Sequence, residues 1–338
     1  MSLMQIKDEN NRTIEISFSQ LSQICGCNIY RKNYVMKYIA HYFSKKKYCE
    51  DELEVYHNQY PEILLDGEQL SRSRYECTHI TSIEDIENEL SFFKDSTLYK
   101  YISNSFETTN ISESIQKIDD AILQIANDFE SNMTIDFINN IKMNAVIVDK
   151  DKILKNFIFA KAEINSLYLK YVDNFAKLKL YLAIEEHLLK TTGVSKLILI
   201  SNIEKIVKKE VMPQLSKQIE NLLKYNAYIM IESNEKDYIL GSIYDLGSIN
   251  ILANINVYLP NIHVLTETIN RNYPINKYFD EREVYEIVKR VANMLFDSNY
   301  AYGCTKDDII IKILNKFYDI NCNAPEILTT EERSFLQN

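Results

Sequence analysis

Short, continuous apolar runs alternate with amphipathic helical patterns in two separated parts of the chain. The runs lie at residues 21–25, 196–200, 228–231 and 255–259. A run that is apolar at nearly every position predicts a strand buried on both faces, as in a parallel sheet. The apolar residues that follow the first run recur at helical spacing: Val35, Tyr38, Ile39 and Tyr42. We therefore predict an α/β fold whose parallel or mixed sheet combines two distant sequence blocks.

Local signals add turns and helix ends to this picture. A helix is expected over 206–223, with a kink at Pro213, and a hairpin over 63–80 that turns at Asp66-Gly67. Asp280 and Glu283 have the spacing of a capping box, and Thr305 is the expected cap of a last helix.

In the segment between the two blocks, the apolar residues recur at helical spacing, which predicts helices. Its first stripe alternates four and three residue steps, the spacing of a heptad repeat: Ile111, Ile115, Ile118, Ile122, Ile125 and Phe129. A second helical stretch is predicted over 153–189, with this stripe: Phe157, Ala160, Ile164, Leu167 and Tyr171. A break near 144–151 favours two antiparallel helices that form an arm and invite oligomerisation; the alternative is that both stripes pack on the α/β part.

The predicted organisation is an α/β head over 1–90 and 191–300, a helical arm over 91–190, and a C-terminal helical extension over 301–338. Only 6 Gly and 5 Pro occur in 338 residues, which is typical of a helix-rich chain.

A partly kept phosphate-binding motif follows the first predicted strand. In the pattern GxxxxGK[ST], Gly26 and Lys32 hold their positions, whereas Arg31 replaces the second glycine and Asn33 replaces the hydroxyl residue. A side chain at the second glycine position crowds the loop, and an amide is a poorer magnesium ligand than a hydroxyl. The pattern indicates a degenerate phosphate-binding loop of an ATPase-like head; the alternative is an ordinary strand, turn and helix.

A nucleotide hydrolase also needs an acid at the end of a second buried strand. The strand over 197–200 ends in Ser201-Asn202, and the nearest acid is Glu204. Because both elements are altered, we predict that hydrolysis is lost, with no catalytic residue. ATP is not expected as a cofactor, and none is required. An active ATPase or nucleotide kinase that uses Lys32 remains the alternative.

Charge and cysteine content restrict the class of protein. The formal net charge of −10 argues against a uniformly basic surface, but not against a basic channel inside an acidic shell. The six cysteines form no zinc-binding spacing, and no apolar run is long enough to cross a bilayer. We expect a reduced, cytoplasmic protein without a membrane partner.

The order of several segments resembles the long form of the Csn-two family, which serves spacer acquisition in subtype II-A CRISPR systems. The segments are Gln-Ile-Cys-Gly-Cys-Asn, His41-Tyr-Phe-Ser, Leu-Leu-Asp-Gly-Glu, a helical insert, Leu-Ile-Leu-Ile-Ser-Asn-Ile-Glu, and Asn272-Tyr-Pro-Ile-Asn-Lys-Tyr-Phe. The resemblance spans about residues 12–330 and depends on order and spacing.

The resemblance implies a homotetrameric ring that holds double-stranded DNA ends in a basic channel. It also implies that the ring works beside the CRISPR integrase and the RNA-guided effector nuclease. Some members of the family bind calcium, so Asp128 and Glu130, at the matching break of the helical insert, are candidate ligands; surface solvation is the alternative.

Basic residues near the expected head loops are the candidate DNA contacts: Lys45, Lys46, Lys47, Arg72, Arg74, Lys205, Lys208 and Lys209. Such contacts neutralise phosphates without reading sequence. Arg31 and Lys32 are further candidates, and solvated helix ends are the alternative for the lysine run. A purely structural oligomer is a third functional class.

Overall fold

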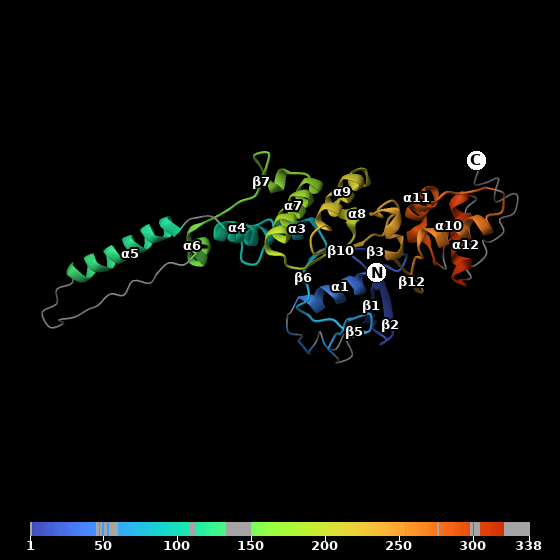
Figure 1. Ribbon diagram of the computed structural model, residues 1–338, viewed down its shortest axis with the longest axis horizontal. Helices are drawn as coiled ribbons and strands as arrows, with labels where there is room; N and C mark the ends of the chain where they lie inside the picture. Colours follow the sequence, from blue (N-terminus) through green and yellow to red (C-terminus); the bar gives the residue numbers. More distant parts are fainter. Residues whose placement is uncertain are drawn as a thin grey trace. The chain divides into compact units, whose positions relative to one another are not determined.

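The structure is a computed structural model that describes residues 2–44, 47, 49–50, 53, 60–108, 112–132, 150–253, 255–275, 277–297, 300 and 305–320. The chain divides into two compact units (Figure 1). Residues 1–85 and 192–338 form one unit, here called the head, and residues 86–191 form the other, called the helical unit. The helical unit is thus inserted into the head in sequence.

A six-stranded mixed sheet, in the order β12-β11-β3-β10-β9-β6, forms the centre of the head. Its strands are β3 (Leu21–Cys25), β6 (Glu76–Ile80), β9 (Lys196–Ile200), β10 (Ala227–Glu232), β11 (Ile249–Leu252) and β12 (Asn256–Tyr258). All neighbouring pairs are parallel except β11 with β12. β3 lies between strands from the second sequence block. The predicted α/β fold with a mixed sheet from two blocks is confirmed.

The fourth predicted strand is wrong in position and type. The buried parallel strand is β11, whereas residues 255–259 contribute only the antiparallel edge strand β12, with Tyr258 42% exposed. Asn250 interrupts the apolar run of β11, which is why the pattern did not show it. Its side chain is nevertheless satisfied: it accepts from the N–H of Ser17 and donates to the carbonyls of Ser17 and Gln23.

A second sheet, of order β2-β1-β4-β5, contains the first residues of the chain. Its strands are β1 (Ser2–Lys7), β2 (Thr13–Phe18), β4 (Leu64–Leu65) and β5 (Glu68–Gln69). Asp66 and Gly67 both have positive φ, so the predicted turn is confirmed, but the hairpin ends at β5 because β6 joins the parallel sheet. The second sheet shares a core with α1 (Ile29–Phe43) and one face of the parallel sheet.

The predicted helix over 206–223 is divided. α8 (Ile203–Ile206) ends at Val207, which is extended, and after a 3₁₀ turn over Lys209–Val211 the longer α9 (Met212–Leu222) begins. Pro213 lies in the first turn of α9, where its missing N–H has no helical acceptor to lose. The expected kink is therefore a helix start.

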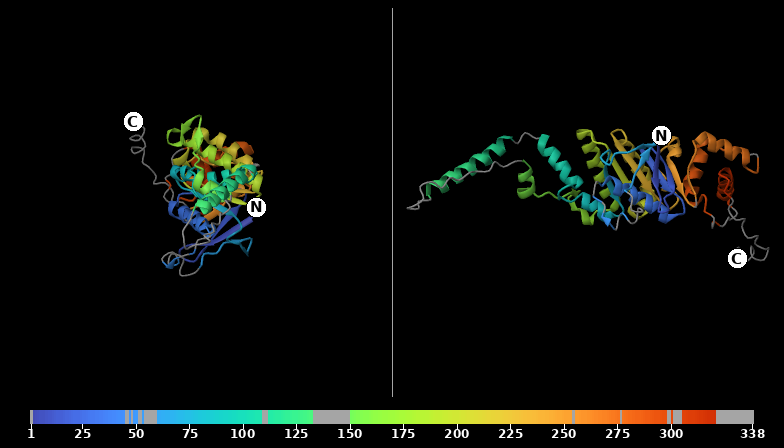
Figure 2. Two further views of the ribbon diagram at one scale, coloured as in Figure 1. Left: turned by 90° about the vertical axis from the view of Figure 1, so that its left-hand side faces the viewer. Right: turned by 90° about the horizontal axis from the view of Figure 1, so that it is seen from below.

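The last three α-helices that the structure describes lie together at one end of the head (Figures 1 and 2). They are α10 (Ile262–Asn272), α11 (Glu281–Val291) and α12 (Lys306–Phe317). The predicted capping box of Asp280 and Glu283 starts α11, and Thr305 caps α12, as expected. Apolar side chains of α10, α11 and α12 share one core, so α12 is not a separate extension.

The helical unit contains α3 (Ile83–Glu89), α4 (Thr97–Thr108), α5 (Ser112–Asn132), α6 (Lys150–Phe157) and α7 (Asn174–Thr192). The second long helix over 153–189 is wrong, because a hairpin of β7 (Glu163–Ile164) and β8 (Leu167–Tyr168) separates α6 from α7. Asn165 and Ser166 form its turn with positive φ, a conformation that ends a helix. Most of the predicted break near 144–151 lies outside the described residues.

Within the described part of the chain, no helix is long and apolar enough to cross a membrane. That the helical unit forms an arm projecting from the head stays a prediction.

Candidate functional site at the carboxyl edge of the parallel sheet

The turn after β3 has a backbone that only glycine fits. Gly26 has φ +106°, and a Cβ there would lie 2.3 Å from the carbonyl oxygen of Leu252 on neighbouring β11. The N–H of Gly26 donates to Oδ1 of Asn293, at 2.9 Å. The first glycine of the motif is therefore required by packing between two strands, without reference to any phosphate.

The start of α1 is capped by the chain itself. The Asn28 side chain accepts from the N–H of Arg31, at 2.9 Å. The Arg31 guanidinium lies 3.2 Å from the Asp8 carboxylate. Burial opposes ionisation of Asp8, but hydrogen bonds from the backbone of Arg12 and Asn10 and from Arg31 hold its pKa below the ordinary value. Arg31 thus has an internal acid as its partner.

Lys32, the motif lysine, is fully buried and points back into the head. Its ammonium donates to the carbonyl oxygen of Ser233, directly after β10, at 2.8 Å. Burial lowers the pKa of Lys32, and the acidic side chains of Glu232 and Glu204 partly oppose that shift. Because the side chain is 0% exposed, a phosphate in solvent does not reach this ammonium in the observed conformation. Asn33, the last motif position, is half-buried.

Glu232, the last residue of β10, is a buried acid that sequence reasoning missed. It is 0% exposed, and neither carboxylate oxygen has a hydrogen-bond partner within the described part of the chain. Burial raises the pKa of Glu232, against the opposing influence of Ser201 and Lys32. The signal was present, because an acid directly follows the apolar run 228–231. In the sequence, we looked for the acid of a nucleotide hydrolase only after the apolar run 196–200.

The ends of β9 and β10 are joined by a polar network. Asn234 donates through Nδ2 to Asn202 Oδ1 at 2.7 Å and to Glu204 Oε1 at 2.8 Å. Asn202 has φ +52°, which turns the chain into α8. The hydroxyl of Ser201 lies 3.0 Å from Nε2 of His79 on β6. The predicted Ser201, Asn202 and Glu204 therefore do lie at one edge of the sheet, close to Lys32.

Three of the predicted DNA contacts lie at this carboxyl edge. Lys205, Lys208 and Lys209 are exposed and follow β9 directly. β3 and β9 both run parallel to β10, so the Gly26 turn and these lysines leave the sheet on the same side. The edge thus combines a buried lysine with three exposed ones.

The other described candidates lie at the opposite edge. Arg72 and Arg74 precede β6, which is parallel to β9, so they belong to the amino edge. Arg72 is half-buried and donates through Nε to the carbonyl of Tyr42, near the end of α1, at 3.0 Å. Lys47, just beyond α1, is exposed, whereas Lys45 and Lys46 lie outside the described residues. The candidates therefore do not form one surface.

The calcium candidates and the cysteines show no built chemical site. Asp128 and Glu130 are exposed on α5, and no group of three His, Cys, Asp or Glu side chains that could hold a metal ion occurs among the residues that the structure describes. Burial raises the pKa of Cys25 and of Cys77 to about 12, so both thiols stay protonated at neutral pH.

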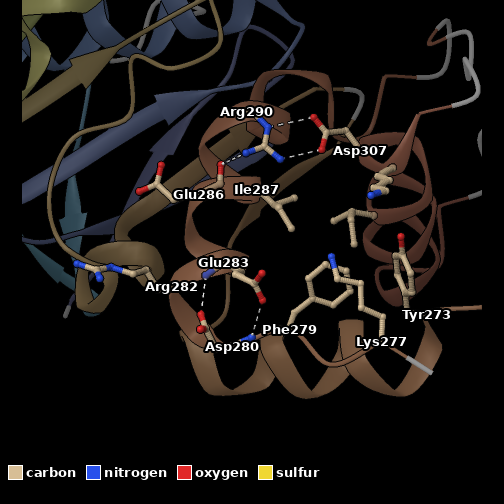
Figure 3. A pocket seen from close by; sticks show the side chains of 12 residues that line it. Tyr273, Lys277, Phe279, Asp280, Arg282, Glu283, Glu286, Ile287, Arg290 and Asp307 are labelled. Atoms are coloured by element: carbon tan, nitrogen blue, oxygen red, sulfur yellow. Dashed lines mark hydrogen bonds and ion pairs between the residues drawn. The ribbon is translucent and has the colours of Figure 1, made fainter. Parts of the chain in front are cut away.

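A separate cavity of about 420 Å³ lies between the loop before α11 and the start of α12. Figure 3 shows the Lys277 side chain beside Phe279, and the ammonium lies 4.1 Å from the centre of the Phe279 ring. At the rim Arg290 forms two hydrogen bonds with the Asp307 carboxylate, at 3.1 and 2.9 Å. The arginine is already paired, so it ties α11 to α12.

Comparisons with known proteins concern nearly the whole chain. The family model for CRISPR-associated protein Csn2, subfamily St, matches residues 6–337. The crystal structure of Stu0660 of Streptococcus thermophilus superposes with a TM-score of 0.89 at 22% identity and covers 99% of each chain, which shows a common fold. The SmcHead bound to the C-winged helix domain of ScpA gives a TM-score of 0.40 at 10% identity, covering 76% of this chain and 97% of that one. No curated protein sequence matches.

Proposed function

Because the chain belongs to the CRISPR-associated protein Csn2 family, subfamily St, we propose that it binds double-stranded DNA ends without sequence preference and acts in spacer acquisition. In this proposal it does so as a homotetrameric ring, beside the CRISPR integrase and the RNA-guided effector nuclease. It hydrolyses no nucleotide and requires no cofactor.

One observation carries the proposal: at the carboxyl edge of the sheet the motif lysine is buried, while its three neighbours on the segment 205–209 are exposed. A lysine that is 0% exposed and bonded to a backbone carbonyl is poorly placed to stabilise a transferred phosphoryl group. Exposed lysines on a short segment can instead neutralise neighbouring phosphates of a DNA backbone.

The same edge supports a phosphate-loop ancestry for the head. Along the sheet, the parallel strands are ordered β11, β3, β10, β9, β6, and the strand that precedes the loop lies in the interior. Ligands of open α/β sheets bind at the carboxyl ends of interior strands. We infer that the ATPase-like site lost its nucleotide chemistry and that its edge now serves DNA.

The test is a gel shift on linear and closed-circular DNA across a salt series. We expect binding to linear DNA only, because a ring has to be threaded by a free end, and affinity that falls with salt. Equal binding of closed circles would contradict the ring.

Charge variants locate the DNA-binding surface. The variant K205A/K208A/K209A is expected to weaken binding and to reduce the salt slope by about 0.9 for each phosphate that is no longer neutralised. The control K190A/K217A/K224A removes the same charge from three other exposed positions. Equal weakening in both variants would mean that only net charge matters.

The alternative enzyme uses Lys32 for ATP or nucleotide turnover. It predicts phosphate release that K32A abolishes, and a flat phosphate-release trace for the wild type rejects it. A purely structural oligomer predicts assembly that ignores DNA in the same gel shift.

A further inference from the structure

Four buried oxygen atoms without a hydrogen-bond partner among the described residues occur at the ends of β9 and β10. They are both carboxylate oxygens of Glu232, Oε2 of Glu204 and Oδ1 of Asn234. An ionised carboxylate accepts hydrogen bonds and donates none, and the same is true of an amide oxygen. Each of the four atoms can therefore be satisfied only by a donor or a cation. Buried acceptors without donors are costly, so a concentration of them in two adjacent loops indicates a missing positively charged or donating group.

Hydrogen bonds join two of these three side chains, Asn234 and Glu204. Nδ2 of Asn234 donates to oxygens of both Asn202 and Glu204, and its N–H also donates to Glu204 Oε1 at 3.3 Å. Because both partners of Nδ2 are oxygens, the amide orientation is determined and Oδ1 is left facing elsewhere. The negative charge of Glu204 contributes to the raised pKa of Glu232, after the larger contribution of burial.

Few donors lie nearby. The Lys32 ammonium donates one of its three protons to the Ser233 carbonyl, and the Ser201 hydroxyl lies 3.0 Å from Nε2 of His79. One lysine also leaves one of the two carboxylates uncompensated. A single water molecule has two protons and no charge, so it can satisfy only part of this set.

We propose that the carboxyl edge of the head binds one hard divalent cation, of the magnesium or manganese class, through Glu232, Glu204 and Asn234. Hard cations take carboxylate and amide oxygens, and magnesium needs only one or two carboxylates because it retains several waters. Those waters supply the donors that the remaining acceptors lack. This site is distinct from the pair Asp128 and Glu130 on α5, and it requires neither nucleotide nor DNA.

The experiment titrates the metal-depleted full chain with Mn²⁺ and follows free Mn²⁺ by electron paramagnetic resonance. One saturable site per chain is expected, from which Mg²⁺ displaces Mn²⁺. The variant E232Q keeps the shape of the side chain but removes its charge, and is expected to weaken Mn²⁺ binding at least tenfold. E210Q, at an exposed acid in the 3₁₀ turn after α8, and D128N/E130Q are the controls, and both are expected to bind as the wild type does.

Two results would overturn the site. One is a wild type that binds no Mn²⁺ in a saturable manner. The other is an E232Q variant that binds as tightly as E210Q. Circular dichroism verifies the fold of E232Q; if that variant does not fold, N234A removes the amide ligand at a half-exposed position and is read in the same way. A wild type without a site, together with an E232Q variant of raised stability at neutral pH, would mean that Glu232 is buried as a neutral acid.

Discussion

At the scale of single residues, a match to the phosphate-loop motif does not determine what the residue does in the structure. Gly26 was predictable, because its need for positive φ follows from a tight turn between strand and helix. The direction of Lys32 was not, since its partner Ser233 is 201 positions away in the sequence. The orphaned carboxylate of Glu232 was equally hidden: an acid after a strand is visible, but its lack of donors depends on the packing of three strands.

Replacing Gly26 by alanine tests the packing role of the turn. The new Cβ would meet the Leu252 carbonyl at 2.3 Å with φ at +106°, so we expect the free energy of unfolding to fall by about 3 kcal/mol or more. The control is Gly193→Ala, where φ is +67° and no atom lies within 4 Å of the new Cβ, so only about 1 kcal/mol is expected. Urea denaturation measures both; equal decreases would show that the packing against Leu252 is unimportant.

His79 makes stability depend on pH. Burial lowers its pKa from 6.5 to about 4, so the folded state keeps the ring neutral while the unfolded chain takes up a proton. Stability is therefore present above pH 6.5 and is lost as the pH falls toward 4, by about 3 kcal/mol in total. Denaturation of wild type and H79Q at several pH values checks this. The difference between the two free energies should shrink with falling pH, and a constant difference would contradict it.

At the scale of elements, strands and helices with a regular pattern of apolar residues could be predicted. Elements whose polar residues are satisfied by other parts of the fold could not. β9 and β10 have continuous apolar runs and were found, whereas β11 was missed because Asn250 is satisfied only by groups on β2, on β3 and before β11. Likewise the stripe over 157–171 matched a helix, although the turn at Asn165 and Ser166 makes it a hairpin. Tertiary partners decided the first case, and a local turn decided the second.

Over residues 113–131 of α5, where the structure describes the side chains, none is buried, although the helix contains most of the heptad stripe. Ile118 is 41% exposed and Ile125 is 56% exposed, which is costly unless another surface covers them. We expect I118E/I125E to lower the mass of the assembled protein in light scattering, with a melting temperature close to that of the wild type. Q116E/Q124E adds the same charge to other exposed positions of α5 and should assemble normally. An unchanged mass in both variants would show that the stripe is no assembly surface.

At the scale of the whole molecule, family and α/β class could be inferred from the order of segments, but the distribution of charge could not. The two basic clusters belong to opposite edges of one parallel sheet, a division that depends on strand direction and not on spacing. A single DNA duplex in a channel would contact one edge of each head directly. The lysines of 205–209 and the arginines before β6 are therefore two separate candidate DNA-binding surfaces, and each has to be tested with its own variant.

The proposed ring has a direct test in its mass. One chain has a mass of 39.7 kDa, so four chains give 4 × 39.7, or about 159 kDa. Light scattering coupled to gel filtration, at the protein concentration of the DNA-binding assay, should give this value, and K205A/K208A/K209A should retain it, because those lysines are assigned to DNA and not to assembly. R72A/R74A removes two charges at the opposite edge, and the same mass is expected. A monomer in the wild type would contradict the proposed ring, and any remaining DNA affinity would then belong to the surface of a single chain.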